Sequence, residues 1–320
     1  MRSERGEAIV WLNGRLVPAA EATVPFLTPA LHYGVAAFEG IRSYATPRGA
    51  AVFRLRDHTR RLCQSARVLG FRELPYGEEA IAAAILETVA ANGLEDCYIR
   101  PLIWLAEGGW NLSLDGGRPS VGIAVWPWRD YLGPEALRRG IRANISSFAR
   151  LHPNVAMTKA KISGNYANSV LARTDSQRLG FEEAILLDPQ GYVAECTGEN
   201  IFTVAGGRLR TPPAAAILPG ITRDTLLWLA RDAGLEAEES MLSRDDLYTA
   251  DEVLVCGTAA EVMGVREIDF RVIGTGEPGP ITLKLQTLYR DATRGEHPGV
   301  TEWLAFVPAS SESPADAGAP

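Results

Sequence analysis

Short apolar runs bounded by turn sequences predict several strands in the first 130 residues. The clearest is an initial hairpin, where two apolar runs flank Asn13-Gly14, a pair that favours tight β-turns. Residues 31–40 are rich in aromatic and small side chains, which predicts a loop or a helical turn. Two segments with apolar residues at helical spacing end near glycine, which predicts helices. The predicted strands are residues 9–12, 15–17, 41–44, 51–54, 97–104 and 121–126, and the predicted helices are residues 57–69, with Asp57 as N-cap, and 78–92.

After residue 136 the pattern predicts hairpins and helices in mixed order. A helix over residues 164–180 places Tyr166, Val170 and Leu171 at helical spacing, and Ser243 begins another with a capping-box-like sequence. In the first 130 residues strands and helices do not alternate regularly, so their order favours an α+β domain with an antiparallel sheet over a doubly wound parallel sheet. The other predicted elements are strands at 141–148, 184–187, 192–196, 201–204, 208–210, 252–256 and up to 268, and helices from 217–224 to Gly234 and at 282–293.

Two prolines and a glycine fall within residues 127–134, which is typical of a linker. We therefore predict a small N-terminal domain over residues 1–127, a linker over 128–135 and a C-terminal domain over 136–307. Residues 308–320 lack large apolar side chains, which predicts a disordered tail.

The composition is that of an ordinary soluble protein, with 46% hydrophobic and 22% charged residues among 320. The net charge is −7 and the basic residues are interspersed with acidic ones, so nothing indicates nucleic-acid binding. No apolar stretch reaches the roughly 18–20 residues of a membrane span, and no apolar signal core follows the first residues. We expect a cytoplasmic protein that does not bind a membrane.

The cysteines do not suggest a metal site or a disulfide framework. Cys63, Cys97, Cys196 and Cys256 form no CxxC pair and have no nearby histidine in the sequence, so we expect reduced, mostly buried thiols and no metal. The sequence also lacks a G-x-S-x-G nucleophile motif, a P-loop and a G-x-G-x-x-G fingerprint.

The stretch 157–166 carries the most specific candidate chemistry, because it places two lysines where the chain enters a predicted helix. A catalytic lysine attacks a carbonyl as the neutral amine, so it needs a rigid mount and surroundings that favour that form. The residues alone leave Lys159 and Lys161 both open, and a solvated surface lysine is the alternative for each.

Three segments offer positive charge or backbone N–H groups to an anion: the helix start at 220–222, the strand end at 257–259, and the pair Arg60-Arg61. Each alone is as typical of an ordinary cap or turn, but their occurrence together with a lysine favours a phosphate site.

Glu195 and Glu199 lie in a turn between two apolar strands. Either is compatible with an exposed turn residue. The alternative is that Glu195, at the end of its strand, faces an aromatic nitrogen and keeps it protonated, since a buried carboxylate is stable beside a cationic partner.

Taken together, these residues resemble the fold-type IV pyridoxal-phosphate enzymes and, within them, the branched-chain amino acid aminotransferases. The resemblance extends to about residue 307. It implies a two-domain α+β fold with a smaller N-terminal α/β sandwich, a larger β-barrel-like C-terminal domain with helices, and pyridoxal 5'-phosphate at their interface. The motifs that carry it are residues 33–34, 38–42, 58–62, 98–102, 161–166, 195–200, 218–223 and 257–261.

The resemblance implies roles for single residues around the cofactor. Lys161, with Gly164 and Tyr166, matches the family pattern K-x-x-G-x-Y, whose lysine is catalytic and forms an imine with the cofactor; Lys159 does not match. Tyr166 would bond the phenolic oxygen and Glu195 would pair with the pyridine nitrogen. The residues that would bind the phosphate end are Arg61, Ile221, Thr222, Gly257 and Thr258.

The resemblance also implies a pocket for an aliphatic substrate side chain, which aromatic walls would bury at about 25 cal/mol per Å². Arg100 would help to bind the carboxylate end, and the amides of Thr258 and Ala259 would assist with the α-carboxylate. Tyr33 would reach the neighbouring subunit's site, which implies a homodimer or a higher homo-oligomer. The matching aromatic residues are Tyr33, Phe38, Tyr98, Trp128 and Tyr131.

The implied activity is that of a branched-chain-amino-acid transaminase, which exchanges amino groups between L-leucine, L-isoleucine or L-valine and 2-oxoglutarate by a ping-pong mechanism. The rivals of the same fold are a D-amino acid or (R)-amine aminotransferase and an aminodeoxychorismate lyase. Residues 38–42 and the spacing Tyr98-x-Arg100 favour the branched-chain branch. A non-catalytic cofactor-binding protein is the rival of a different class.

Overall fold

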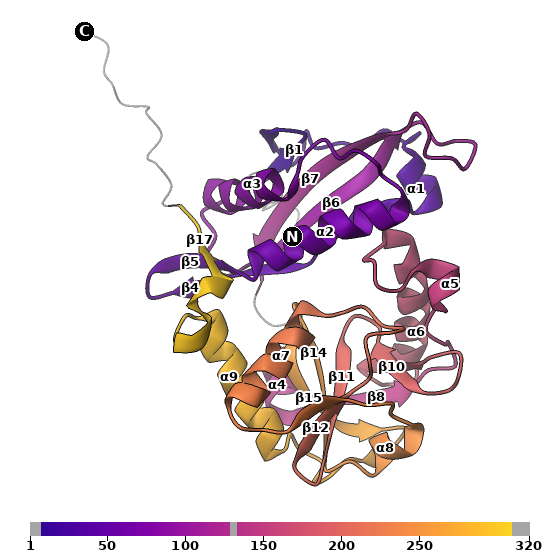
Figure 1. The fold of residues 1–320 in the computed structure, drawn as a ribbon, viewed down its shortest axis with the longest axis vertical. Coiled ribbons are helices and arrows are strands. Elements are labelled where there is room, and N and C mark those ends of the chain that lie inside the picture. Colours follow the sequence, from indigo (N-terminus) through magenta and orange to yellow (C-terminus); the bar gives the residue numbers. More distant parts are fainter. Residues whose placement is uncertain (1–7, 129–132, 309–320) are drawn as a thin grey trace.

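The computed structural model describes residues 8–128 and 133–308, which form two β-sheets with helices packed against them (Figure 1). The first sheet lies in the upper half of Figure 1 and the second in the lower half. Half of the predicted linker and nearly all of the predicted tail lie outside the described residues, so the division into domains stays a prediction. The α+β fold class is confirmed.

The first sheet has the strand order β17-β5-β4-β6-β7-β1-β2, with β3 also on β6, and each of these pairs is antiparallel. The predicted hairpin across Asn13-Gly14 is confirmed. β17 comes from the C-terminal part of the chain, so the end of the predicted second domain completes the first sheet. The strands are β1 (Ile9–Leu12), β2 (Arg15–Pro18), β3 (Ala36–Phe38), β4 (Ile41–Thr46), β5 (Gly49–Phe53), β6 (Cys97–Glu107), β7 (Arg118–Pro127) and β17 (Leu304–Phe306).

The helices of this half are α1 (Pro29–Tyr33), α2 (Leu55–Leu69) and α3 (Glu78–Ala91). α2 and α3 lie across the sheet (Figure 1) and bury one face each. Ile81, Ile85 and Val89, four positions apart on α3, share a core with Leu62 and Ala66 of α2. Their burial at about 25 cal/mol per Å² makes this face the main stabilising contact of the helices.

Two sequence predictions in this half are wrong in detail. Asp57 is not the N-cap of its helix: α2 begins two residues earlier, and its N-cap is Arg54 in the left-handed region at φ +53°. Asp57 instead accepts a 2.5 Å hydrogen bond from Arg54 Nε, so its carboxylate holds the arginine. The segment predicted as a loop or turn over residues 31–40 contains the end of α1 and the strand β3.

The second sheet has the order β10-β9-β8-β15-β14-β11-β12-β13, with β16 on β15. Its pairs are mixed, because β8 is parallel to both β9 and β15, and β12 is parallel to β13. The predicted antiparallel sheet belongs to the N-terminal part, where it is confirmed. In this half the helix between β8 and β9 acts as a crossover, which parallel neighbours require. The strands are β8 (Ile141–Ile145), β9 (Glu183–Leu187), β10 (Val193–Cys196), β11 (Asn200–Ala205), β12 (Arg208–Thr211), β13 (Ala237–Glu239), β14 (Glu252–Gly257), β15 (Glu261–Ile268) and β16 (Arg271–Val272).

The helices of the second half are α4 (Pro134–Arg139), α5 (Pro153–Ala156), η1 (Ser163–Asn165), α6 (Tyr166–Arg178), α7 (Ile221–Asp232), α8 (Arg244–Tyr248), α9 (Pro280–Thr293) and η2 (Pro298–Trp303). The predicted capping box that begins at Ser243 is present. The predicted apolar side of α6 is not its buried side: Ala172 packs against the sheet, whereas Val170 and Leu171 are 63% and 53% exposed.

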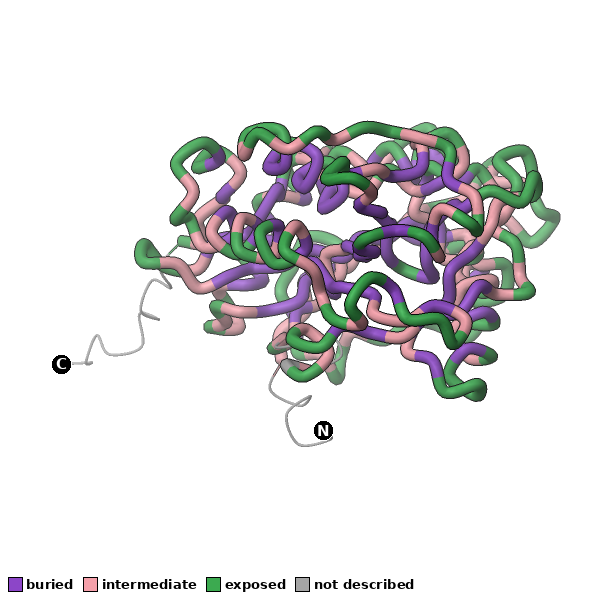
Figure 2. The backbone as a smooth tube through the Cα atoms, turned by 90° about the horizontal axis from the view of Figure 1, so that it is seen from below, coloured by how far each residue is buried: buried purple, intermediate pink, exposed green. Residues whose placement is uncertain are grey.

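Buried segments follow the strands and the inner faces of the helices, and exposed segments form the outer loops (Figure 2). The four cysteines are buried and free, as predicted. Within residues 8–128 and 133–308 there is no cluster of three metal-ligating side chains. A search of the same residues finds no helix with the length and apolarity needed to cross a membrane.

Candidate active site

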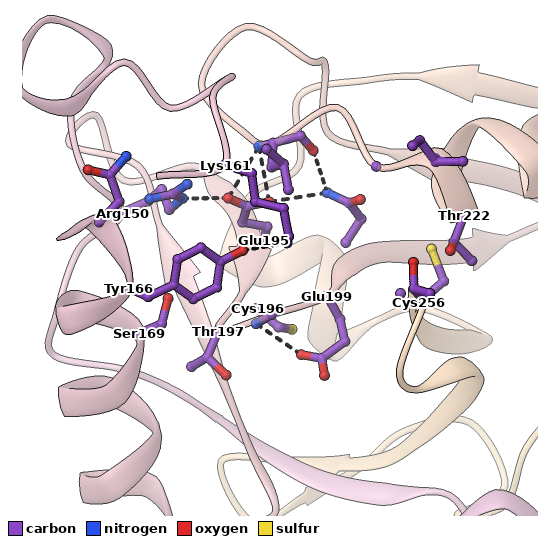
Figure 3. A pocket seen from close by; sticks show the side chains of 18 of the residues that line it. Arg150, Lys161, Tyr166, Ser169, Glu195, Cys196, Thr197, Glu199, Thr222 and Cys256 are labelled. Atoms are coloured by element: carbon purple, nitrogen blue, oxygen red, sulfur yellow. Dashed lines mark hydrogen bonds and ion pairs between the residues drawn. The ribbon is translucent and has the colours of Figure 1, made fainter. Parts of the chain in front are cut away.

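A cavity of about 620 Å³, part of it open to solvent, lies among α6, β10, β14 and the start of α7, with Arg61 of α2 in its wall (Figure 3). The eight residues that the sequence assigns to the cofactor all line it: Arg61, Lys161, Tyr166, Glu195, Ile221, Thr222, Gly257 and Thr258. They come from segments up to nearly 200 positions apart in the chain, so the fold gathers the predicted set in one place.

Lys161 is mounted on the first sheet. Its carbonyl accepts a hydrogen bond from the backbone N–H of Phe38 (3.1 Å), its own N–H donates to Ser65 Oγ (2.9 Å), and Ile162 bridges to Ala37. Its Nζ donates to Tyr166 Oη at 2.7 Å. Lys159 is exposed and lies outside the wall of this cavity, so the structure separates the two lysines of the stretch.

Glu195 lies across the cavity on β10, with only 6% of the residue exposed. Its carboxylate accepts hydrogen bonds from Arg150 Nε, from Asn200 Nδ2 (3.2 Å) and from the backbone N–H of Leu218 (3.2 Å). Burial raises the pKa of Glu195, and the charge and hydrogen bond of Arg150 oppose that rise without cancelling it. The carboxylate is thus fixed in position and short of positive charge.

Asn200 links Glu195 to the loop that leads into α7. Its Nδ2 donates to both Glu195 Oε2 and the carbonyl of Leu218 (3.1 Å). Its Oδ1 lies so close to Gly220 that a Cβ at that position would be 1.9 Å away. Gly220 is therefore required by packing, since its φ of −68° is one that any residue adopts.

Arg61 is held by a buried carboxylate. Its Nε and NH2 donate to the two oxygens of Glu39 at 2.6 and 2.8 Å, and NH1 donates to the carbonyl of Pro219 (2.9 Å). His58 Nδ1 lies 2.8 Å from Glu39 Oε2. Burial acts to raise the pKa of Glu39, but the charge of Arg61 and the hydrogen bonds from Arg61 and His58 outweigh it and hold that pKa well below its usual range.

The first turn of α7 points its backbone amides at the cavity. Its N-cap, Gly220, has no side chain to cap them, so the N–H groups of Ile221 and Thr222 are free of a side-chain partner. The N-terminus of a 12-residue helix carries about half a positive charge. Together with Arg61, this end of the cavity suits a phosphate, while Glu195 and Lys161 suit a cationic ring and a carbonyl carbon.

Comparison with known proteins agrees with this arrangement. The family model for amino-transferase class IV matches residues 36–268. A branched-chain-amino-acid aminotransferase of Pseudomonas aeruginosa is 45% identical over 94% of this chain and 98% of its own, and one of Escherichia coli K12 is 42% identical over 93% and 97%. The chain belongs to the branched-chain-amino-acid aminotransferase family of class IV.

Solved structures of this family superpose closely on the chain. The Escherichia coli branched-chain amino acid aminotransferase has a TM-score of 0.92 at 41% identity and covers 94% of this chain and 100% of its own. The enzyme of Thermobaculum terrenum, solved in its PLP-bound holo form, has a TM-score of 0.88 at 36% identity, with 94% and 98% covered. The predicted family, fold class and enzyme class are therefore confirmed.

Four of the residues predicted for the substrate pocket of this aminotransferase lie together. The Phe38 ring packs against Tyr166 with centroids 4.8 Å apart, and the Arg100 guanidinium lies 4.7 Å from the Phe38 centroid. Arg100 NH2 donates to Tyr98 Oη (3.2 Å), and Tyr98 lies 4.8 Å from Trp128. The contacts thus begin at Phe38 beside the lysine, pass Arg100 and Tyr98 and end at Trp128, and these four residues lie next to the cavity without belonging to its lining.

The other predicted substrate residues are placed differently. Tyr33 lies apart from the cavity on α1, 43% exposed, with its ring 5.9 Å from that of Trp110. Ala259 follows Thr258 in the turn after β14. Tyr131 lies outside the described residues. The roles of all of these residues stay predictions.

Four side chains that hold the aminotransferase site together were not predicted: Glu39, His58, Arg150 and Asn200. Glu39, His58 and Asn200 lie inside the motifs of the resemblance, so the signal for them was present, and a buried Arg61 needs an anion close by. Arg150 lies outside those motifs, and no pattern in the sequence indicates it.

Glu199, the second carboxylate of the turn, also lines the cavity and is 6% exposed, so it is not the exposed turn residue that the sequence allowed. Burial raises its pKa, and the charge of nearby Glu183 adds to that rise. Glu183 accepts hydrogen bonds from the backbone N–H and the hydroxyl of Thr197. Glu199 accepts a hydrogen bond from the backbone N–H of Gly198 (3.1 Å), so Glu183 and Glu199 both bind the backbone of the turn that follows Glu195.

Proposed function

We propose that this aminotransferase transfers the amino group of L-leucine, L-isoleucine or L-valine to 2-oxoglutarate, using pyridoxal 5'-phosphate bound in the cavity. The observation that carries the proposal is the placement of Lys161 Nζ in one cavity with a buried carboxylate, Glu195, and the uncapped start of α7. These are the groups that a pyridine nitrogen, a carbonyl carbon and a phosphate require.

The residues fit this cofactor by their chemistry. Arg61 and the N–H groups of Ile221 and Thr222 would hold the phosphate, and Thr258 would complete that end with its hydroxyl. Glu195, which is short of positive charge, would hold the protonated ring nitrogen. When bound, pyridoxal phosphate supplies an electron sink that stabilises negative charge at the substrate's α-carbon.

The protein's own part in the reaction is to move one proton and to hold the reactants. Lys161 Nζ would take the proton from the α-carbon of the amino acid and deliver it to the carbonyl-derived carbon of the cofactor, and the return step with the 2-oxo acid would run the same transfer in reverse. Tyr166 Oη, which accepts a hydrogen bond from that nitrogen, fixes its direction. The mount of Lys161 on Phe38 and Ser65 limits its motion to the side chain.

The residues predicted for the substrate pocket suit a branched aliphatic side chain in one half-reaction and a dicarboxylate in the other. Phe38, Tyr98 and Trp128 offer apolar ring surface, which stabilises an aliphatic side chain by burial. Arg100, stacked on Phe38, would bind the distal carboxylate of 2-oxoglutarate or glutamate. The amides of Thr258 and Ala259 would bind the α-carboxylate common to both substrates.

The enzyme works as a homodimer or a higher homo-oligomer in the cytoplasm under this proposal. Its support is a group of exposed apolar side chains on and around α1 and the loop after β6, which contact with a second copy would bury. These are Phe26 (75% exposed), Leu27 (68%), Leu31 (64%), Tyr33 (43%), Trp110 (47%) and Leu112 (80%). Light scattering after gel filtration measures the mass in solution; a monomer at micromolar concentration contradicts this part.

The function is tested by assaying L-leucine, L-isoleucine, L-valine and D-alanine as donors with 2-oxoglutarate. We expect turnover of the three L-amino acids, and turnover of D-alanine alone would overturn the proposal. Borohydride reduction of the cofactor-loaded protein followed by peptide mapping tests the site. We expect the label on Lys161, whereas a label on Lys159, or none, contradicts the assignment.

A further inference from the structure

Glu261 has a backbone conformation that is usual for glycine. Its φ is +56°, in the left-handed region where the Cβ of an L-residue crowds the following carbonyl. The residue closes the tight turn between β14 and β15, since it pairs in register with Gly257. A three-residue hairpin loop commonly has glycine at its left-handed position. A glutamate there points to a use for its side chain.

The carboxylate of Glu261 is bound by an arginine of the first sheet. Arg42 NH1 donates to Glu261 Oε1 at 2.5 Å, and only 6% of the Arg42 side chain is exposed. Arg42 lies on β4 opposite Tyr98 of β6, and its guanidinium lies 4.6 Å from the ring centroid of Tyr44. β4 and β6 are interior strands, so the arginine is a fixed anchor. The ion pair therefore ties the β14–β15 turn to the other sheet.

Thr258 and Ala259 lie between the two ends of this turn. Thr258 lines the cofactor cavity, whereas Arg42 and Glu261 do not belong to its wall. A backbone N–H binds a carboxylate well only when it is held within about 0.5 Å and 10–20° of the productive geometry. A turn held by one strained residue and one ion pair meets that requirement only while the pair is formed.

We propose that Glu261 is a positioning residue, whose ion pair with Arg42 holds the turn so that the amides of Thr258 and Ala259 bind the substrate's α-carboxylate. The inference rests on the proposed transaminase function. Because the amino acid and the 2-oxo acid share this carboxylate, the ion pair contributes to the binding of both. It contributes less to the binding of the cofactor, because Glu195 and Lys161 hold the ring end and Arg61 and the start of α7 hold most of the phosphate, with Thr258 as the main contact from this turn.

Two substitutions of Glu261 distinguish a role of its carboxylate from a requirement for the left-handed backbone conformation alone. Glu261→Gly removes the carboxylate but suits the left-handed conformation better than glutamate does. If the turn needs only that conformation, the glycine variant binds carboxylates as well as the wild type. If the ion pair places the turn, the glycine variant loses affinity even though its backbone is less strained. Glu261→Gln keeps the side chain's size and removes its charge.

The experiment titrates 4-methylvalerate, a carboxylate with no amino group, into the cofactor-loaded enzyme and follows the absorbance of the bound cofactor. We expect both Glu261 variants to raise the Kd of 4-methylvalerate about tenfold, equivalent to about 1.4 kcal/mol. The KM values for L-leucine and 2-oxoglutarate rise by a similar factor, while kcat and the Kd for pyridoxal phosphate stay within about twofold of the wild type.

Two substitutions on the same hairpin serve as controls. Phe270→Gly changes another left-handed residue, at φ +62° and 75% exposed, at the far end of β15. Glu267→Gln removes a carboxylate from the same strand. Both are expected to leave the Kd of 4-methylvalerate unchanged.

The outcomes separate this inference from the function on which it rests. If the wild type binds 4-methylvalerate and the Glu261 variants bind it equally well, the positioning role is wrong and the proposed function stands. A lower Tm with unchanged Kd and KM values likewise identifies the ion pair as purely structural and overturns the inference. If the wild type turns over no branched-chain L-amino acid, the proposed function falls, and this inference with it.

Discussion

Lys161 Nζ donates a 2.7 Å hydrogen bond to the hydroxyl of Tyr166, five positions later in the chain. The lysine lies in an extended segment bridged to the first sheet, the tyrosine is the first residue of α6, and the short helix η1 turns the chain between them. The pair is therefore formed by local backbone geometry before any ligand binds. This explains why the short family pattern K-x-x-G-x-Y includes both residues.

Removing the tyrosine hydroxyl tests this contact. In Tyr166→Phe the lysine nitrogen loses an acceptor, and a hydrogen bond that involves a charged group contributes about 1.5–3 kcal/mol. We expect kcat to fall by about 10–100-fold, with the cofactor still bound. Steady-state kinetics and the absorbance of the bound cofactor measure the two effects. Tyr192→Phe, at an exposed tyrosine, is the control, and equal kcat values for the two variants would contradict the role of Tyr166.

The two lysines of the stretch 157–166 provide a matched pair. We expect Lys161→Gln to lower kcat by about 10²–10⁴-fold, the range for a positioned proton-transfer group, and to abolish borohydride labelling. Lys159→Gln changes an exposed residue outside the cavity and is expected to behave as wild type. Loss of activity in both variants to the same extent would mean that the cavity geometry does not identify the catalytic amine.

Much of the secondary structure follows from the sequence, because the signals are local. The Asn13-Gly14 hairpin and the capping box at Ser243 depend on residues that are neighbours in the chain. The parallel pairing of β8 was not predictable in this way, since it depends on which distant strands lie beside it. The start of α2 was misplaced because Asp57, a favourable capping residue, is used instead to bind Arg54.

In the candidate site, too, local patterns were predictable and contacts between distant positions were not. Residues within one motif, such as Lys161 and Tyr166, were found by spacing. Glu39 lies within the motif 38–42, but the sequence does not indicate its role, because its contact with Arg61 joins positions 22 apart in the chain. Arg150 reaches Glu195 across 45 positions, and no local pattern records that. The predicted side chains are those that would face the ligand, and the missed ones are those that hold them.

The stability of the protein is expected to fall in acid because of Glu39 and His58. The pKa of Glu39 is lowered in the folded protein, so its ionised form stabilises the fold at pH values above the ordinary range for glutamate, and that contribution is lost as the pH falls through and below this range. Burial also lowers the pKa of His58, so its protonation below about pH 6.5 acts in the same direction.

Glu39→Gln isolates the carboxylate's share of this effect. Arg61 would keep its buried charge without a counter-ion, which costs about 3–5 kcal/mol of unfolding free energy at pH 7. We expect the unfolding free energy of the variant to vary less between pH 4 and 7 than that of the wild type, as measured by urea titration. Glu236→Gln, at an exposed ion pair, is the control. A variant with the wild-type pH profile would show that Glu39 is not the group responsible.

Asn200 lies against Gly220, so we expect Gly220→Ala to lower Tm and cofactor affinity, whereas the similar substitution Gly77→Ala is not expected to do so. Gly220 and Gly77 are both N-caps of helices with extended backbone conformations, so Gly→Ala changes the cap in the same way at each. A Cβ at position 220 would lie 1.9 Å from Asn200 Oδ1, whereas at position 77 no described atom beyond the neighbouring residues lies within 4 Å.

In Gly220→Ala the new methyl group displaces the side-chain amide of Asn200. That amide binds both Glu195 and the Leu218 carbonyl, so it must release one of them. Such overpacking costs about 1–3 kcal/mol, so we expect a lower Tm and weaker binding of pyridoxal phosphate, measured by thermal unfolding and by fluorescence titration. Gly77→Ala is expected to change Tm slightly and to leave cofactor affinity as it is. Asn200→Ser would free the space that the new methyl group needs. In the Gly220→Ala background we therefore expect it to restore part of the lost Tm. If Tm does not recover, the strain does not come from the contact with Asn200.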